Sequence, residues 1–263
     1  AKGESTPLRQ ARAPLMLLRA LLWGFCLPML PLCWLQGWYF RRRTEMLTSP
    51  DDLPSGSSGN ETSDTTLNIL GLGDSVIQGV GLCSFADSVT ARVSTGLAQF
   101  SRRSTRWRAL GSQGAKAQDI VEVLQHEDIS SLDVAIISVG VNDVTGLTSL
   151  LQWQSAVFQI VSRLRARGSV KIIILGLPPM HRFDRLPQPL RGVLGIRAQM
   201  LDLVLERSLA GLPFAEHVSL DALDPKRGMA SDGFHPSPAG HQAIAALVIS
   251  GADHLLHRTD VED

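Results

Sequence analysis

The sequence has no surplus of charge of either sign, because 25 lysine and arginine residues balance 25 aspartate and glutamate residues. Proteins that bind nucleic acid need a basic surface to meet the phosphates, so we expect no nucleic-acid partner. Cysteine is also scarce. Cys26, Cys33 and Cys83 have neither a paired spacing nor a zinc-binding pattern, so we expect neither a disulfide framework nor a structural metal.

Charge is absent altogether from one stretch near the N-terminus. The 21 residues from Ala20 to Phe40 contain no charged side chain, and three arginines at 41–43 follow at once. That length can span a bilayer. A cleaved signal peptide has a shorter apolar core and a small-residue cleavage site, so the pattern favours an uncleaved membrane anchor at 20–40, within an N-terminal segment 1–43.

Two other interpretations of this stretch stay open, a degenerate signal peptide and a helix that lies in the membrane interface. Both are considered because Gly24, Pro28 and Pro31 weaken a helix. Basic residues flank the stretch on both sides. The positive-inside rule therefore favours a cytoplasmic location of the C-terminal domain only slightly, through the arginine cluster at 41–43.

Composition divides the rest of the chain into three parts. Residues 44–65 are rich in serine, proline, glycine and aspartate and have almost nothing apolar to bury, which predicts a flexible linker. A globular domain is expected over 66–258, with a short tail at 259–263. About 190 residues are enough for one domain with a full core.

Short apolar runs alternate with longer stretches of helical period across this domain. The runs 134–139 and 170–177 are almost wholly apolar, as parallel strands covered on both faces should be. Apolar residues at three- and four-residue steps indicate amphipathic helices between the runs, as in 150–164. The alternation predicts an α/β fold with a doubly wound parallel sheet and helices on both faces. The five expected strands are 67–72, 106–110, 134–139, 170–177 and 217–220.

Four short motifs follow the ends of expected strands. They are Gly73-Asp74-Ser75, Gly114, Gly140-Val141-Asn142-Asp143 and Asp232-Gly233-Phe234-His235-Pro236. The first three follow the first three strands, and the last follows the fifth. Ligands of open α/β sheets bind outside the carboxyl ends of the strands, so we expect the four motifs to meet at one rim of the sheet.

Each motif alone has an ordinary explanation, such as a glycine turn or a helix cap. Together they contain the parts of a serine hydrolase. Ser75 can attack, His235 can take its proton, and Asp232, three residues earlier, can orient the imidazole. The backbone N–H groups of Ser75 and Gly114 and the side-chain amide of Asn142 can donate to an oxyanion. The ordinary explanations are independent of one another, so the joint occurrence in this order favours a hydrolase.

On these residues the chain resembles the SGNH hydrolase superfamily, also called GDSL esterases and lipases, over about Leu67 to Leu256. The resemblance implies a three-layer α/β/α, flavodoxin-like domain, here preceded by an N-terminal hydrophobic helix. It also implies that Ser75, Asp232 and His235 form the triad and that Gly114 and Asn142 donate to the oxyanion.

The chain departs from the family pattern at three positions. Val76 replaces the leucine of the GDSL name, Ala109 stands where the second motif usually begins with asparagine, and Lys116 replaces a common threonine. None is a catalytic position. The two changes in the second motif leave Gly114 as the weakest assignment.

The reaction expected from these residues is hydrolysis of short-chain acyl, aryl or lipid esters through an acyl-Ser75 intermediate, without a metal or an organic cofactor. The loop 178–187 could overhang the cleft, so Met180, Phe183 and Leu186 are candidate substrate contacts, against ordinary anchoring of the loop. The rival hypothesis is a membrane-tethered binding module that keeps the fold without the activity. A flavodoxin-like nucleotide binder is disfavoured, because the first turn has no glycine-rich phosphate cradle.

Overall fold

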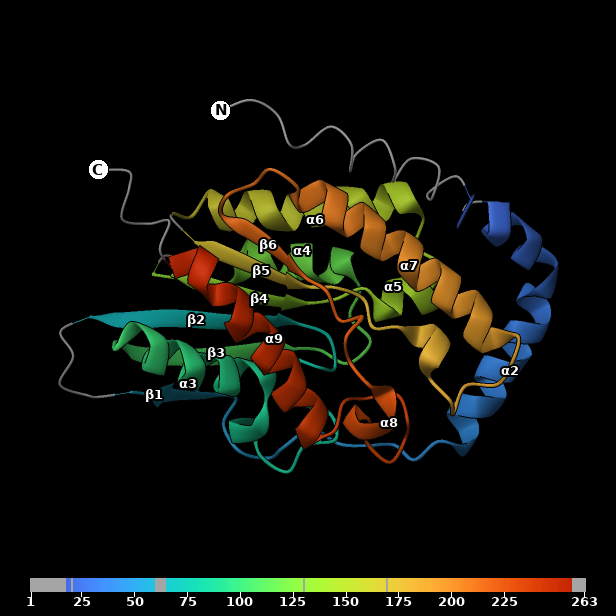
Figure 1. Cartoon of the computed structure of the whole chain (residues 1–263), viewed down its shortest axis with the longest axis horizontal. Helices are drawn as coiled ribbons and strands as arrows, with labels where there is room; N and C mark the ends of the chain where they lie inside the picture. The colour runs from blue at the N-terminus through green and yellow to red at the C-terminus, as the bar shows by residue number, and fades with distance from the viewer. Residues whose placement is uncertain (1–17, 20, 60–64, 130, 169, 257–263) are drawn as a thin grey trace.

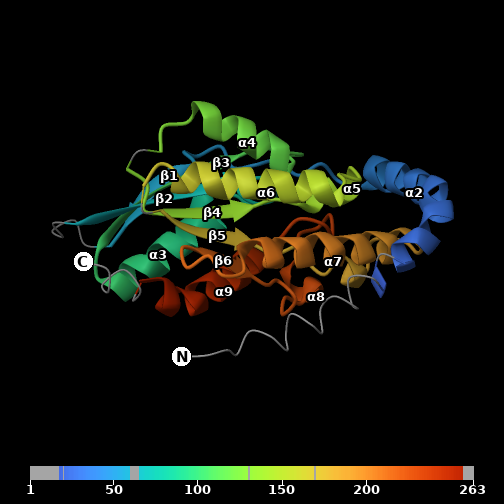
Figure 2. The same cartoon turned by 90° about the horizontal axis from the view of Figure 1, so that it is seen from above.

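The structure is a computed structural model that describes residues 18–19, 21–59, 65–129, 131–168 and 170–256. The expected tail at 259–263, residues 60–64 of the expected linker and residues 1–17 lie outside this part of the chain. Helices cover both faces of one central sheet, which confirms the three-layer α/β/α architecture (Figures 1 and 2). The sheet order is β1-β3-β2-β4-β5-β6. The strands are β1 (Ser55–Ser58), β2 (Thr66–Gly73), β3 (Ser104–Gly111), β4 (Val134–Ser138), β5 (Lys171–Leu175) and β6 (Ala215–Val218).

Alternating side chains of the central strands separate the core into two halves. In β4, Ile136 packs with the half that contains α3 (Val89–Ser101) and α9 (Pro238–Leu256). Its neighbour Ile137 packs with the half that contains α4 (Ala117–His126), α6 (Leu150–Arg165) and α7 (Leu190–Leu209). All five residues of β4 are buried, as a strand covered on both faces requires.

The predicted five parallel strands are present, but the sheet has a sixth strand. β2 to β6 pair in parallel, whereas β1 pairs antiparallel with β3 at the edge. β1 falls in the segment 44–65 that was expected to be a flexible linker, so residues 55–58 depart from that expectation. The sequence Ser-Gly-Ser-Ser has no apolar pattern that would indicate a strand. It joins the sheet by pairing with the backbone groups of β3. The last strand also lies at 215–218 rather than at 217–220.

The N-terminal apolar segment is helical. Residues 21–26 lead into a short 3₁₀ turn η1 (Leu27–Met29) and then α2 (Leu30–Arg43), and the 23-residue stretch Leu21–Arg43 is long and apolar enough to cross a membrane. A signal sequence would meet the same criterion. In Figure 1 this helix lies beside the N-terminal end of α7, at one end of the domain.

Inward residues of this helix recur at three- and four-residue steps, the spacing of one helix face. Trp23, Cys26, Leu30, Cys33 and Phe40 all pack against the core half that contains α7. The apolar residues on its other faces are exposed, such as Trp34 at 72%. The helix therefore packs on the domain with one face while leaving other apolar faces uncovered.

Candidate active site

The first, second and third motifs follow directly from the carboxyl ends of β2, β3 and β4. The fourth motif lies between α8 (Pro225–Gly228) and α9, beyond the end of β6. The fold thus brings Ser75, His235 and Asp232 into one hydrogen-bonded array, although Ser75 and His235 are 160 residues apart in sequence.

Ser75 is held at the tip of β2 by its neighbours. The N–H of Asp74 donates to the carbonyl of Ser138 (3.0 Å), and Oδ1 of Asp74 accepts from the N–H of Val76 and from Oγ of Ser138 (3.1 Å each). A side chain on Gly73 would collide with the Ser138 carbonyl, which explains the glycine there. These contacts fix the turn that presents Ser75.

Asp74 is almost fully buried, at 2% exposure. Burial raises the pKa of its carboxyl to about 6, against the opposing effect of its hydrogen bonds and of the nearby His235. A titratable group with a pKa near neutrality thus lies directly beside Ser75.

Asp232 and His235 belong to one tight turn. The carboxylate oxygen Oδ1 of Asp232 accepts from the backbone N–H groups of Phe234 and His235 (2.9 and 3.0 Å), and Oδ2 lies 2.5 Å from Nδ1 of His235. Gly233 allows the turn, since its φ of +67° is in the left-handed region. Burial opposes ionisation of Asp232, but the hydrogen bonds from the His235 ring and the two N–H groups outweigh it and lower the pKa of the carboxyl.

The other ring nitrogen of His235, Nε2, lies 3.1 Å from Oγ of Ser75. The imidazole is therefore placed between a buried carboxylate and a hydroxyl group. This arrangement can transfer the hydroxyl proton to the ring while the carboxylate stabilises the resulting imidazolium.

The three proposed oxyanion donors occupy the first three loops. Among the described residues, no protein group accepts from the backbone N–H of Ser75 or of Gly114. Gly114 has a φ of +86° in an exposed turn, with nothing within 4 Å of the position a side chain would take. Nδ2 of Asn142 donates to the carbonyl of Ala115 (3.0 Å), which fixes the amide and leaves its second hydrogen available.

The second and third loops are also joined by Asp143. This residue is 1% exposed, and its Oδ2 accepts from the N–H of Ala117, the first residue of α4 (3.0 Å). Burial raises the pKa of the Asp143 carboxyl, although hydrogen bonds from Ala117 and Thr148 oppose the change. Asp143 thus braces the loops that hold Asn142 and Gly114.

The three candidate substrate contacts of loop 178–187 are buried, at 0% for Met180, 2% for Phe183 and 3% for Leu186. Phe183 packs edge-on against Phe234 (ring centroids 6.0 Å apart), and Phe234 packs edge-on against His235 (5.5 Å). Direct contact of the three side chains with a substrate stays a prediction that their burial does not support. In the structure Phe183 packs behind the histidine through Phe234, and Met180 and Leu186 belong to the hydrophobic core.

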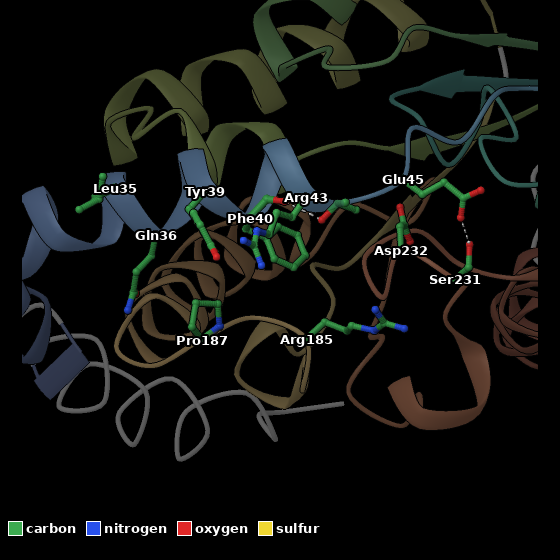
Figure 3. A pocket seen from close by; sticks show the side chains of 11 residues that line it. Leu35, Gln36, Tyr39, Phe40, Arg43, Glu45, Arg185, Pro187, Ser231 and Asp232 are labelled. Atoms are coloured by element: carbon green, nitrogen blue, oxygen red, sulfur yellow. Dashed lines mark hydrogen bonds between the residues drawn. The ribbon is translucent and has the colours of Figure 1, made fainter.

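No group of three or more histidine, cysteine, aspartate or glutamate side chains in the described residues could hold a metal ion. Sequence reasoning missed a pocket of about 830 Å³ beside the array, which Asp232 lines together with residues of α2 (Figure 3). It missed the pocket because the apolar pattern of 20–40 predicted a membrane anchor and gave no sign of contact with the domain.

The fold and the hydrogen-bonded Ser–His–Asp array are of the kind found in serine hydrolases. The model of the GDSL-like Lipase/Acylhydrolase family matches residues 72–243, and the chain belongs to this family. Membership supports a carboxylic ester hydrolase.

Relatives and solved structures agree with this assignment. A GDSL-like esterase of Mycobacterium tuberculosis is 24% identical over 204 residues, which cover 74% of this chain and 65% of the relative, so the match spans less than two thirds of that protein. A lipase/acylhydrolase from Enterococcus faecalis has a TM-score of 0.57 at 20% identity. This match covers 71% of this chain and 95% of the Enterococcus faecalis chain. A family 3 carbohydrate esterase from Clostridium thermocellum has a TM-score of 0.58 at 16% identity. This match covers 73% of this chain and 98% of that esterase chain. At such identities the structures bear on the fold alone.

Proposed function

We propose that the protein is a serine esterase that hydrolyses carboxylic esters through an acyl-Ser75 intermediate. His235 takes the proton from Oγ of Ser75 as the oxygen attacks the ester carbonyl, and then gives that proton to the departing alcohol. In the second half, His235 activates a water that releases the acid from Ser75. Asp232 holds the ring in the required tautomer throughout.

One observation carries this proposal: both nitrogens of a single imidazole are engaged, one by a buried carboxylate and one by a hydroxyl. The distances are 2.5 Å from Nδ1 to Asp232 and 3.1 Å from Nε2 to Ser75. A histidine with a purely structural role does not require a hydrogen bond between its second nitrogen and a serine. A general base for Ser75 requires that hydrogen bond.

The N–H groups of Ser75 and Gly114 and the amide of Asn142 are proposed to stabilise the negative oxygen of the tetrahedral intermediate. The family and the open N–H groups support this role. Such donors act mainly on the transition state, so their effect falls on turnover more than on ground-state binding.

The substrates proposed are short-chain acyl, aryl or lipid esters, in a domain at 66–258 that an N-terminal helix attaches to a membrane. An apolar stretch long enough to cross a bilayer supports the attachment. Neither side of the membrane is favoured by the structure.

The test is hydrolysis of p-nitrophenyl acetate, butyrate and octanoate by the full chain in a non-ionic detergent. Ser75→Ala should abolish turnover and labelling by a fluorophosphonate, because it removes the oxygen proposed to form the acyl or phosphonyl bond. Ser112→Ala is the matched control, since Ser112 lies in the exposed second loop. Equal labelling of the Ser75→Ala variant would mean that another residue is the nucleophile.

The alternative, a binding module without activity, has one distinguishing outcome. A folded wild-type chain that neither hydrolyses any of the three esters nor reacts with the fluorophosphonate would favour it.

A further inference from the structure

The pocket beside the catalytic array is built by two segments that are far apart in sequence. One wall comes from the last turns of α2 and the residues just after it, at 35–45, and the other from 185–187 and the triad turn at 231–232. Figure 3 shows these side chains along one groove, with Asp232 towards one end and Leu35 towards the other. Two hydrogen bonds, through His235, connect Asp232 to Ser75.

Specific hydrogen bonds hold α2 at this position. The side chain of Gln36 donates from Nε2 to the carbonyl of Gln188 (2.8 Å) and accepts at Oε1 from the N–H of Leu190 (3.1 Å), at the start of α7. Just beyond α2, Glu45 accepts from Oγ of Ser231, the residue before Asp232 (3.0 Å). These bonds tie both ends of the α2 wall to the elements that form the opposite wall.

The walls combine an apolar surface with two cationic groups. Leu35, Tyr39, Phe40 and Pro187 supply the apolar part, and the guanidinium groups of Arg43 and Arg185 lie in the same pocket. Arg43 is stacked over the ring of Tyr39, 4.6 Å from its centroid.

Neither arginine has an acidic partner within the described part of the chain. Two carboxylates also line the pocket. Asp232 is hydrogen-bonded to His235, and Glu45 accepts from Ser231, and neither is in ion-pair contact with the two arginines. Within the described residues, no carboxylate is in ion-pair contact with either guanidinium group, so both can bind an anionic group in this pocket.

We propose that this pocket is a substrate subsite for an amphiphilic ester that carries an anionic group. The apolar chain lies against Leu35, Tyr39 and Phe40, and the anionic group lies between Arg43 and Arg185. The volume of about 830 Å³ is within the range of small-molecule sites. The inference rests on the proposed esterase function, and it assigns to the N-terminal helix a part in selecting the substrate.

The first test compares two leucines of α2 in the full chain, in a non-ionic detergent. Leu35 lines the pocket and Leu32 does not, yet the two are similarly exposed, at 52% and 49%. Leu35→Gln should lower kcat/KM for p-nitrophenyl palmitate about tenfold and leave the acetate within twofold, because only a long acyl chain extends along the groove to Leu35. Leu32→Gln should leave both values unchanged. Equal effects of the two variants on the palmitate would overturn the subsite.

The second test measures binding without turnover. Titration calorimetry of the Ser75→Ala variant should show hexyl phosphate binding at least tenfold more tightly than hexanol. Adding Arg43→Ala and Arg185→Ala should remove that difference, whereas adding Arg41→Ala and Arg42→Ala, which lie outside the pocket, should keep it. Equal binding of the two ligands by the Ser75→Ala chain would refute the anionic part of the site.

The two tests also separate the subsite from the activity. Loss of acetate hydrolysis in wild type would contradict the esterase proposal, while the calorimetry would still report on the pocket. Acetate hydrolysis with no preference for hexyl phosphate would leave the esterase in place and remove the subsite.

Discussion

The carboxylate of Asp232 binds His235 twice, once through the backbone and once through the ring. Oδ1 accepts from the His235 N–H at 3.0 Å, while Oδ2 lies 2.5 Å from Nδ1 of the same residue. The first bond fixes the turn, and the second fixes the ring within it. The Asp232 side chain is only 3% exposed, so water does not compete for these bonds. The carboxylate that orients the ring therefore comes from a residue only three positions earlier in the same turn.

Replacement of Asp232 by asparagine should therefore damage catalysis far more than folding. The amide can still accept from the backbone, but an NH₂ group facing Nδ1 favours the tautomer with its proton on Nε2, which cannot accept the Ser75 proton. We expect kcat to fall about 10⁴-fold, as for a carboxylate in the same role elsewhere. Steady-state kinetics on p-nitrophenyl butyrate measures this. Asp224→Asn, at the exposed cap of α8, is the control and should keep full activity. A Asp232→Asn enzyme within tenfold of wild type would exclude the orienting role.

Replacement of Asn142 by alanine should remove one oxyanion donor. We expect kcat to fall 100- to 1,000-fold, in order of magnitude, with KM within about threefold, because the donor acts on charge that develops in the transition state. The bond from Asn142 to the Ala115 carbonyl is lost as well, so thermal unfolding must be measured beside the kinetics. Gln113→Ala in the adjacent exposed turn should change neither. A rise in KM at constant kcat would instead indicate ground-state binding.

Gly114 can be tested against a glycine of the same backbone conformation. Gly114 and Gly211 both have a φ of +86° and open space at the side-chain position. Alanine at either place should cost roughly 1–2 kcal/mol of stability, from the left-handed backbone alone. Only Gly114→Ala should also reduce kcat, because relaxation of the left-handed backbone would turn the N–H of residue 114 away from the reacting oxygen. Equal activity of the two variants would mean that turnover does not depend on the left-handed backbone at Gly114.

Much of the fold followed from local pattern. The apolar runs at 134–139 and 170–177 predicted β4 and β5, because strands buried on both faces consist almost wholly of apolar residues. The motif residues followed from their places after strands, since the carboxyl ends of parallel strands share one rim. β1 could not be predicted, because its Ser-Gly-Ser-Ser sequence pairs only through backbone groups.

The position of the N-terminal helix could not be predicted either. Its inward face is apolar, but so are its other faces, and periodicity therefore does not mark which side meets the domain. The contacts that place it, such as those of Gln36 with 188 and 190, join residues more than 150 positions apart. The burial of Phe183 beneath Phe234 depends in the same way on a distant turn.

Asp74 provides a pH-dependent test of the environment around Ser75. Its carboxyl pKa is raised to about 6 in the folded protein, against an ordinary value of 3.8. Between these values the folded state keeps a proton that the unfolded state has lost. The contribution of Asp74 to stability is therefore full below about pH 4 and is lost as the pH rises through 6.

Asp74→Asn should remove this dependence. The amide oxygen can accept from Val76 and Ser138 as Oδ1 does, so the turn is kept without a buried charge. Between pH 5 and pH 8, the free energy of unfolding of the variant should rise by about 1 kcal/mol relative to that of wild type. The reason is that pH 5 lies one unit below the folded pKa of Asp74, and one pKa unit corresponds to about 1.36 kcal/mol. Chemical denaturation of both proteins at the two pH values measures it, with Asp224→Asn as the exposed control. A difference between Asp74→Asn and wild type that does not change with pH would mean that Asp74 titrates at the same pH in the folded and unfolded states.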